Sequence, residues 1–468
     1  MAEEVLSKEG KLHIVMFPWL AFGHLIPFLE LSKAIARKGH NISFISTPRN
    51  IDRLPKIPQN LVSSFIFVKI PLRKVEGLPE DAESTMDIRA EDMDYLKKAY
   101  DLMETDVAQY LQNSSADAVV YDFASFWVPK IATNLGISRF FYSIFEAWFW
   151  GFFGTVDDLI NELEGRKKPE DYMSPPKWIT FDTNIALKYY EAKMICLAGE
   201  KNASGFSDAY RSGMGISQSD AFILRHCNEF DTEWLNLLAN LYQKPLIPLG
   251  FLPPQFEETE DDDSENWVSL KKWLDYQIEG SVLYIALGSE AMINQDQLTE
   301  LAYGLELADI PFLWAFREPK STGRNMILPD GFEGRIQGRG IVWKGWAPQL
   351  KILDHDSVGG FLTHCGLGST LEALMFGAPL ILLPLMVDQW LNSRILEEKQ
   401  IGVEVERNEE DGSFTRDAVA LAVRLVMVEE GGKKFRDKAK ETGAVFGNRR
   451  LHDRYVDHFI SYLEQKKY

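Results

Sequence analysis

A short turn, His364-Cys365-Gly366-Leu367-Gly368, joins two apolar segments of different periodicity. Val358 to Thr363 reads as a buried strand, and the helix after the turn ends near Gly377-Ala378-Pro379, since Gly and then Pro are typical of helix C-termini. Leu380 to Leu383 then reads as a strand covered on both faces. A strand, glycine turn and helix direct free backbone N–H groups at an anion. We therefore expect a phosphate-bearing ligand where the helix containing Ser369 begins.

Two other interpretations of this turn stay open on spacing alone. Ser369 and Glu372 have the spacing of a capping box, which would satisfy the helix N–H groups with no ligand. Gly366-x-Gly368 also matches two thirds of a dinucleotide fingerprint, and Asp388 lies about 20 residues on, where an acid would bind a ribose. Leu371 stands where the third glycine would be, which counts against an NAD-binding oxidoreductase.

A histidine lies beside the first predicted strand. Leu12 to Phe17 is an apolar run, the loop Trp19 to His24 leads into a helix, and Asn41 to Ser46 alternates as a second strand. In such βαβ units the ligand-binding loops lie at the carboxyl ends of the strands. An imidazole that titrates near neutrality suits a general base, and His24 is our candidate.

A carboxylate in the same half could assist that histidine. Asp122 follows the short apolar strand Ala118 to Tyr121, so it also lies at a strand tip. It could hold the imidazole tautomer and stabilise the imidazolium, with a substrate hydroxyl in place of the serine of a triad. A lone His or Asp at a strand end is more often structural, so this pair alone does not identify a catalytic site.

The chain divides into two α/β halves. Residues 1–248 carry the strands above, a helix expected over roughly Asp92 to Gln112, and an aromatic cluster between Phe145 and Phe153 that we read mainly as core, with a share that could line an acceptor pocket. Residues 249–267 are rich in Pro and acids and read as the linker, 268–445 restart a sheet, and 446–468 should form a helix that packs back on the first half. Two halves with functional loops at strand ends imply a cleft between them.

Composition excludes several classes of function. The 468 residues carry a formal net charge of −19, which argues against nucleic acid and anionic membranes as partners. Three unclustered cysteines suit a reducing compartment and neither a disulfide framework nor a zinc site. The N-terminus lacks the features of a secretory signal, and the most apolar stretch, Phe140 to Phe153, is too short to span a bilayer. We expect a cytoplasmic protein without stable membrane insertion.

The segment Trp346 to Gln389 resembles, almost position for position, the signature box of plant family 1 UDP-dependent glycosyltransferases. The resemblance rests on Trp346-Ala347-Pro348-Gln349, Thr363-His364-Cys365-Gly366, Ser369, Glu372, Gly377-x-Pro379 and Asp388-Gln389. Gly368 departs from the pattern, because most of the family has Asn there. Glycine at this position is common in the branch that extends sugar chains, which Gly77-Leu78-Pro79-Glu80 and Ala286-Leu287-Gly288-Ser289-Glu290 also resemble.

The resemblance implies a fold and a role for each site residue. The fold would be GT-B, α/β, with two Rossmann-like doubly wound domains facing each other across a cleft. His24 and Asp122 would be the catalytic pair. The remaining assignments would be Trp346 and Gln349 for the uracil, Glu372 for the ribose, His364, Ser369, Ser289 and the backbone of Gly366 and Gly368 for the diphosphate, Asp388 and Gln389 for the sugar, and Ser143 as a further sugar contact.

The implied activity is inverting transfer of a sugar, with glucose favoured by Gln389, to a hydroxyl of a terpenoid or flavonoid glycoside. UDP-sugar would be a co-substrate, and neither a cofactor nor a metal is expected, because backbone N–H dipoles can stabilise the leaving diphosphate. The partners would then be the donor and a small-molecule acceptor, and we expect a monomer. Transfer of rhamnose or a pentose, direct action on an aglycone, and a silent nucleotide-sugar-binding protein stay open.

Overall fold

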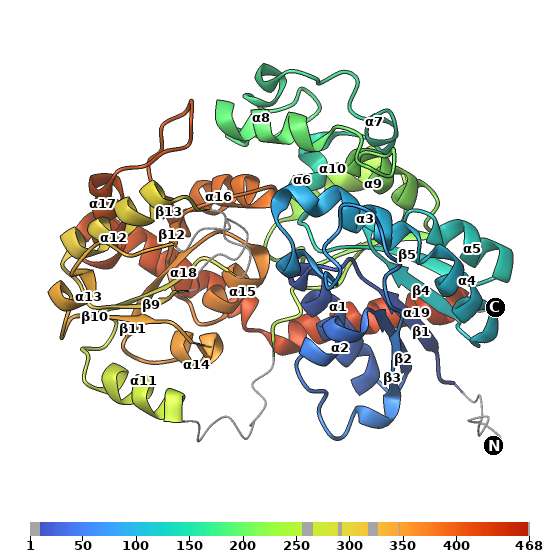
Figure 1. Ribbon diagram of the computed structural model, residues 1–468, viewed down its shortest axis with the longest axis horizontal. Helices are drawn as coiled ribbons and strands as arrows, with labels where there is room; N and C mark the ends of the chain where they lie inside the picture. Colours follow the sequence, from blue (N-terminus) through green and yellow to red (C-terminus); the bar gives the residue numbers. More distant parts are fainter. Residues whose placement is uncertain (1–9, 255–264, 289–292, 317–325, 346, 467–468) are drawn as a thin grey trace.

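The computed structural model describes residues 10–254, 265–288, 293–316, 326–345 and 347–466 (Figure 1). Within these residues two parallel sheets form the frame, with strand orders β3-β2-β1-β4-β5-β6-β7 and β10-β9-β8-β11-β12-β13. The strands of the first sheet are β1 (His13–Phe17), β2 (Asn41–Ser46), β3 (Phe65–Lys69), β4 (Ala118–Tyr121), β5 (Ser138–Ser143), β6 (Ala221–Leu224) and β7 (Leu246–Pro248). Those of the second are β8 (Val282–Ala286), β9 (Phe312–Ala315), β10 (Gly340–Trp343), β11 (Val358–Thr363), β12 (Leu380–Leu382) and β13 (Gly402–Glu404).

Helices cover both faces of each sheet, as parallel sheets require. In the N-terminal half they are α1 (Phe22–Arg37), α2 (Pro48–Arg53), α3 (Met93–Asp101), α4 (Glu104–Asn113), α5 (Val128–Leu135), α6 (Ala147–Phe153), α7 (Val156–Ile160), α8 (Tyr189–Ala198), α9 (Asp208–Ser217) and α10 (Thr232–Tyr242). In the C-terminal half they are α11 (Glu265–Asp275), α12 (Gln295–Ala308), α13 (Phe332–Arg335), α14 (Gln349–Leu353), α15 (Leu367–Met375), α16 (Asp388–Glu398), α17 (Arg416–Met427), α18 (Lys433–Phe446) and α19 (Arg449–Lys466).

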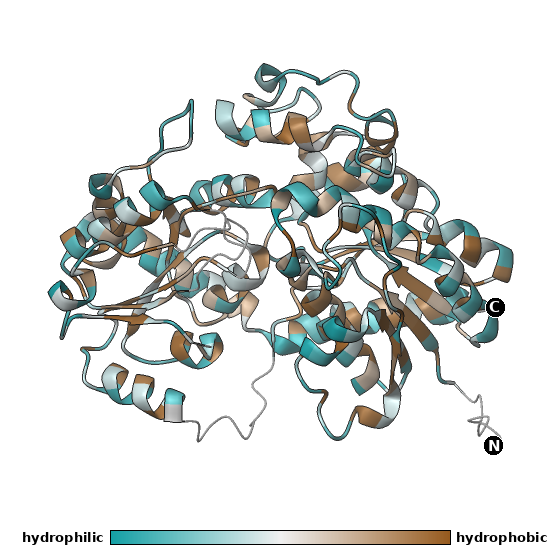
Figure 2. Ribbon diagram, viewed as in Figure 1, coloured by the Kyte–Doolittle hydropathy of each residue, from teal (hydrophilic) through white to brown (hydrophobic). Residues whose placement is uncertain are grey.

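Alternate residues of the strands enter different cores. In β1, Ile14 and Met16 pack with α1 and α19, whereas Val15 and Phe17 pack with α3, α4 and α5 on the other face. All four side chains are fully buried, which is why the strand is apolar without alternation. Figure 2 shows the same separation, with hydrophobic residues concentrated in the strands and hydrophilic ones on the outer sides of the helices.

Each sheet reverses its strand order at one point. In the first sheet the reversal lies between β1 and β4, where Phe17 pairs with Tyr121. In the second it lies between β8 and β11, where Ala286 pairs with Thr363. Ligands of open α/β sheets bind at such switch points, outside the carboxyl ends of the strands. The segments that follow these four strands are therefore the ones that the fold places at a binding site.

The last helix returns to the first half, as Figure 1 shows in red. The ring of Phe459 in α19 packs edge-on against Phe140 of β5, with centroids 5.4 Å apart. Lys38, after α1, forms an ion pair with Asp457 at 2.6 Å. The helix therefore contributes to the core of the N-terminal half, although it follows the C-terminal sheet in sequence.

Several features differ from the sequence-based expectation, among them strand β6, which was not predicted. The helix expected over 92–112 is two helices, α3 and α4, interrupted near Leu102 and Met103. Strand β3 was not predicted, because it is an edge strand whose Ile66 is 57% exposed. Strand β7 was not predicted either, because its three residues end in Pro248, which an edge strand tolerates.

Candidate active site

The candidate catalytic pair, His24 and Asp122, lies at the switch point of the first sheet. Nδ1 of His24 is 2.7 Å from Oδ2 of Asp122, and the residues are only 8% and 2% exposed. The carboxylate also accepts hydrogen bonds from the backbone N–H groups of Trp19 and Phe123, at 3.1 and 2.7 Å. Because the carboxylate is an acceptor, Nδ1 carries the proton. Nε2 is then the nitrogen that can take a proton from a substrate hydroxyl.

His24 belongs to a helix rather than to the loop in which we expected it. Helix α1 begins at Phe22, and the backbone N–H of His24 already donates to the carbonyl of Ala21 at 2.9 Å. The helix fixes the imidazole more firmly than a loop would, because the first turn leaves its backbone little freedom. The rings of Phe123 and Phe145 lie 5.7 and 5.9 Å from the imidazole and flank it with apolar surface.

The turn His364 to Gly368, which we expect to bind phosphate and call the phosphate turn, lies at the switch point of the second sheet. Helix α15 begins at Leu367 with Gly366 as its N-cap, two residues earlier than Ser369. The capping-box interpretation of Ser369 and Glu372 is therefore wrong. The first internal bond of this helix is donated by the N–H of Thr370 to the carbonyl of Gly366. The N–H groups of Leu367, Gly368 and Ser369, in the first turn of the helix, therefore have no acceptor within the helix and could bind an anion.

Glycines bring the backbone close to His364. A Cβ atom on Gly366 would lie 2.4 Å from Nε2 of His364, and one on Gly288 would lie 2.8 Å from the same ring. A Cβ on Gly368 would meet nothing within 4 Å, so this side of the helix end is open to a ligand. Cys365 lies between His364 and Gly366 in the sequence. Its φ of +66° is a left-handed conformation that a non-glycine residue adopts at a cost.

Burial lowers the pKa of His364 to about 4. The imidazole is therefore neutral at pH 7 and faces the phosphate turn as a dipole rather than as a cation. The positive potential for a diphosphate must come mainly from the N-terminal end of α15.

Three predicted residues meet on the surface of α15. Nε2 of Gln349, the first residue of α14, donates to Oε2 of Glu372 at 2.6 Å and to Oγ of Ser369 at 3.2 Å. The hydroxyl of Tyr284 donates to the amide oxygen of Gln349 at 3.3 Å. Burial raises the pKa of Glu372 to about 7, and the bond from Gln349 opposes that shift. The structure thus brings together the groups assigned to uracil, ribose and phosphate.

The residues assigned to the sugar begin helix α16 and do not close a strand, contrary to expectation. Asp388 is the first residue of α16, after Val387 in a strained conformation with φ +49°. The amide oxygen of Gln389 accepts from the backbone N–H groups of Leu385 and Met386, at 3.0 and 3.1 Å, which leaves its NH₂ group for a ligand.

The two domains act on each other at Asp388. Burial raises the pKa of this carboxyl to about 6, while a hydrogen bond from Asn392 and the charge of protonated His24 oppose the shift. The charge of His24, in the N-terminal half, therefore acts on the Asp388 carboxyl, which belongs to the C-terminal half. Asn392 was not predicted from the sequence, although its position four residues after Asp388 places it on the same face of a helix.

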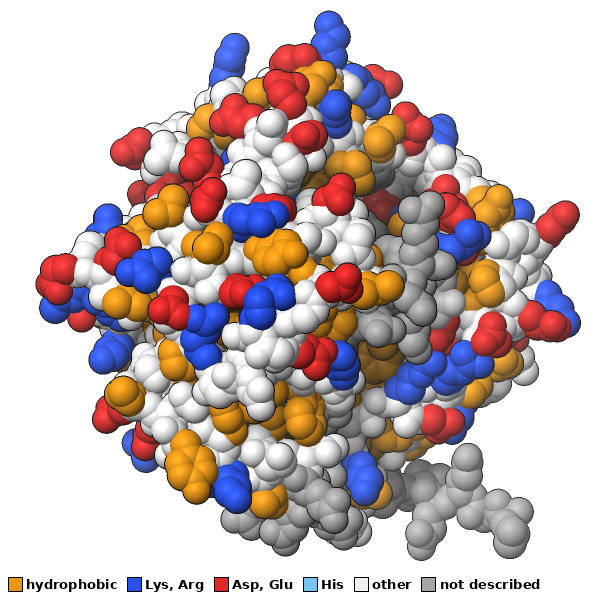
Figure 3. Space-filling view, turned by 60° about the vertical axis from the view of Figure 1, so that its left-hand side comes forward, with side chains coloured by type: hydrophobic (Ala, Val, Ile, Leu, Met, Phe, Trp, Pro, Cys, Tyr) orange, Lys and Arg blue, Asp and Glu red, His pale blue; other side chains and the backbone are white. Residues whose placement is uncertain are grey.

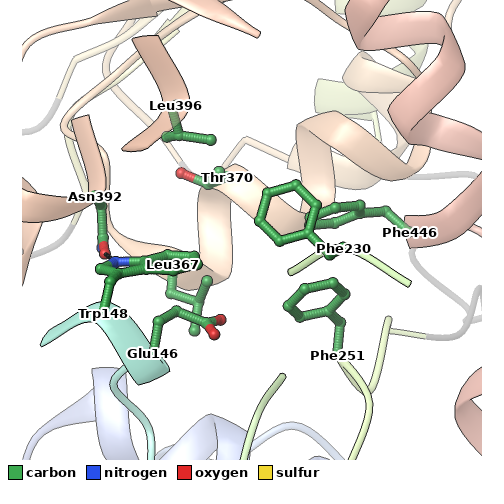
Figure 4. A pocket seen from close by; sticks show the side chains of 9 residues that line it. All are labelled: Glu146, Trp148, Phe230, Phe251, Leu367, Thr370, Asn392, Leu396 and Phe446. Carbon is green, nitrogen blue, oxygen red and sulfur yellow. Dashed lines mark hydrogen bonds between the residues drawn. The ribbon is translucent and has the colours of Figure 1, made fainter. Parts of the chain in front are cut away.

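A pocket lies where the domains meet, next to the phosphate turn (Figure 4). Its lining residues come from both halves: Glu146, Trp148, Phe230, Phe251, Leu367, Thr370, Asn392, Leu396 and Phe446. Trp148 belongs to the aromatic cluster that we expected to be mainly core, and it is 3% exposed. The sequence did not show that this ring reaches the other domain.

Three predicted site residues need separate comment. Ser143 donates to the carbonyl of Phe145 and accepts from the N–H groups of Phe145 and Trp150, and it is 2% exposed. These bonds and this burial leave little of its hydroxyl for a sugar, so we assign Ser143 to positioning Phe145. Ser289 and Trp346 lie outside the described residues.

In the described part of the chain, no three or more His, Cys, Asp or Glu side chains are arranged to hold a metal ion. No helix in the same part is long and apolar enough to cross a membrane. On the face drawn in Figure 3, basic and acidic side chains are interspersed.

Solved structures define the class of fold. UGT2 of Phytolacca americana, complexed with UDP-2fluoro-glucose and pterostilbene, has a TM-score of 0.74 at 23% identity, over 97% of this chain and 100% of that one. UGT73P12 of Glycyrrhiza uralensis has a TM-score of 0.79 at 22% identity, over 98% and 96%. The fold is GT-B, with two Rossmann-like domains.

Sequence comparisons define the family. The family model described as UDP-glucoronosyl and UDP-glucosyl transferase matches residues 265–436. UDP-glycosyltransferase 91C1 of Arabidopsis thaliana is 48% identical, over 98% of each chain. Soyasaponin III rhamnosyltransferase of Glycine max is 43% identical, over 98% of this chain and 97% of that one. The chain belongs to the plant family 1 UDP-dependent glycosyltransferases and is a glycosyltransferase; the oxidoreductase alternative is wrong.

Proposed function

We propose that the enzyme is an inverting UDP-sugar-dependent glycosyltransferase that adds a sugar, with glucose as the expected donor, to a hydroxyl of a terpenoid or flavonoid glycoside. The observation that carries the mechanism is the contact of 2.7 Å between His24 and Asp122, on the domain opposite the nucleotide turn. It supports a base of defined tautomer, whose Nε2 forms no hydrogen bond with the described residues.

The proposed reaction is one displacement step, assisted by His24 and Asp122. Nε2 of His24 accepts the proton of the acceptor hydroxyl as its oxygen attacks the anomeric carbon of the sugar. The bond from that carbon to the β-phosphate oxygen breaks, and UDP leaves with the electron pair. Asp122 stabilises the imidazolium that forms. A single displacement inverts the anomeric centre, because no second carboxylate forms a covalent intermediate.

The donor would lie along the C-terminal domain. Gln349 and Trp346 would hold the uracil and Glu372 the ribose. The backbone of Gly366 and Gly368, together with His364, Ser369 and Ser289, would hold the diphosphate, which suits the free N–H groups at the start of α15. Asp388 and the NH₂ group of Gln389 would then contact the sugar hydroxyls. We expect no metal to be needed.

The finer assignments rest on the relatives. Soyasaponin III rhamnosyltransferase is named for a saponin acceptor and for rhamnose, so a glycoside acceptor is favoured and rhamnose stays an alternative donor. Monomeric state and cytoplasmic location stay predictions.

The test is a panel of UDP-glucose, UDP-rhamnose and UDP-xylose against glycosylated and unglycosylated terpenoids and flavonoids, read by product mass. We expect a mass gain of one hexose on glycosides. Products on aglycones alone would contradict chain extension. Binding of UDP-sugars with no release of UDP for any acceptor would favour a silent binding protein.

A further inference from the structure

One buried amide joins three parts of the proposed active site. Asn392 in α16 is 3% exposed, and its NH₂ group donates to Oδ2 of Asp388 at 2.9 Å and to the carbonyl of Cys365 at 3.0 Å. Its amide oxygen accepts from Nε1 of Trp148 at 2.8 Å. Asp388 and Cys365 belong to the C-terminal domain, which is proposed to bind the donor. Trp148 belongs to α6 of the N-terminal domain.

We propose that Asn392 is a positioning residue for sugar transfer, which sets the Asp388 carboxylate against the donor sugar and links it to the acceptor domain through Trp148. The proposal rests on the proposed function, because it takes Asp388 as a contact of the donor sugar.

An amide is suited to this place because it has two N–H donors and one acceptor oxygen on one rigid plane. The two donors serve a carboxylate and a carbonyl, and the oxygen serves an indole N–H. Neither a carboxylate nor an aliphatic side chain of similar size offers both donors and an acceptor. Every polar atom of the side chain is satisfied, so it holds one orientation.

Two partners of Asn392 lie next to other residues of the proposed site. Cys365 is the strained residue between His364 and the N-cap of the phosphate helix, so its carbonyl orients that turn. Trp148 lies three residues after Phe145, whose ring flanks the His24 imidazole. Figure 4 shows Trp148 and Asn392 meeting on one side of the interdomain pocket, opposite the rings of Phe230, Phe251 and Phe446. A shift at one partner is therefore transmitted to the other two.

The first test separates binding of the sugar from binding of the nucleotide. Asn392→Asp keeps an acceptor for the Trp148 N–H but loses both donors and places two carboxylates side by side. We expect the affinity for UDP-glucose, or for whichever UDP-sugar the wild-type enzyme turns over, to fall at least about tenfold. The affinity for UDP, which has no sugar, should fall by no more than about threefold. Calorimetry gives both constants.

The second test removes the hydrogen bond between Trp148 and Asn392, which joins the two domains. Trp148→Phe keeps the bond between Asn392 and Asp388 and most of the ring packing, and it removes the interdomain donor. We expect donor affinity within about twofold of wild type and a fall of about three- to tenfold in kcat at saturating donor. This variant keeps the proposal testable if the buried charge of Asn392→Asp prevents folding. Asn113→Asp, the same chemical change at the exposed end of α4, is the control. It should change neither the affinity for the UDP-sugar nor kcat.

Two outcomes would overturn the proposal. Wild-type affinity of Asn392→Asp for the UDP-sugar would show that the amide does not position Asp388, and an equal loss for UDP and UDP-sugar would show a merely structural role. An unchanged kcat for Trp148→Phe would remove the interdomain part. Failure of the proposed function looks different, because the wild-type enzyme would then bind or turn over no UDP-sugar.

Discussion

Nδ1 of His24 and Oδ2 of Asp122 lie 2.7 Å apart although the residues are separated by 98 positions in the sequence. The parallel pairing of β1 with β4 brings them together, since each residue follows one of these strands. Asp122 receives two backbone N–H bonds in addition, so its place depends on its ionised oxygens as well as on the imidazole.

Asp122→Asn should lower kcat by about 10²–10⁴, because an amide can present its NH₂ group to Nδ1 and so favour the wrong tautomer. The affinity for UDP should not change, because the proposed nucleotide site lies on the other domain. Steady-state kinetics with calorimetry measures both. Asp106→Asn, which removes a carboxylate from an exposed pair with Arg73, is the matched control and should leave kcat at the wild-type value.

Gly368→Ala should leave the free protein as stable as wild type and weaken UDP binding at least about tenfold. A Cβ here meets no atom of the described residues within 4 Å, so we expect a ligand at the start of α15 to be what opposes it. Thermal melting with and without UDP measures both effects. Gly334→Ala, equally unobstructed and far from the turn, should alter neither. An unchanged thermal shift in Gly368→Ala would contradict the phosphate site.

The affinity for the UDP-sugar, relative to that for UDP, should fall as the pH drops through about 6, the raised pKa of Asp388. Sugar hydroxyls donate to the ionised carboxylate, and protonation removes that acceptor. Asp388→Asn should abolish this additional pH dependence.

The stability of the free protein should change with pH in the opposite sense. The pKa of Asp388 in the folded protein lies above the ordinary 3.8. Its contribution to the free energy of unfolding is therefore full below pH 3.8 and is lost as the pH rises through about 6.

UDP itself should bind more tightly as the pH rises through about 7, the raised pKa of Glu372, because the ionised form accepts both ribose hydroxyls. Calorimetry between pH 6 and 8 tests this, and 2′-deoxy-UDP, which lacks one hydroxyl, should gain less. If UDP affinity is flat over this range, Glu372 does not bind the ribose.

Most buried strands were predictable and the edge strands β3 and β7 were not; the buried strand β6 was also missed. Strands β4 and β11 have the bounds expected from sequence, because strands that are apolar on both faces stand out as short hydrophobic runs. Strand β3 is half-exposed and β7 is three residues long, so neither gives a clear period. Helix α15 was expected to start late because Ser369 and Glu372 imitate a capping box, whereas its true N-cap, Gly366, contributes no side chain.

The residues of the candidate site could be proposed from the sequence, but the contacts between them could not. Strand ends and the family resemblance indicated His24, Asp122 and the turn, because each depends on local sequence. The bond between Trp148 and Asn392 joins residues 244 positions apart on helices of different domains, and no periodicity in one chain reports such a contact. The engagement of Ser143 with Phe145 and Trp150 was equally hidden, because a hydroxyl at a strand end has the same sequence signature whether free or bonded.

The most direct test of the central claim is turnover and UDP binding by His24→Ala, measured together by UDP release and calorimetry. In the proposed mechanism the imidazole takes the acceptor proton and lies on the domain opposite the proposed nucleotide site. We therefore expect kcat to fall by about 10²–10⁴ while the Kd for UDP stays within about threefold of wild type. Turnover at the wild-type rate would show that His24 is not the base and would contradict the account.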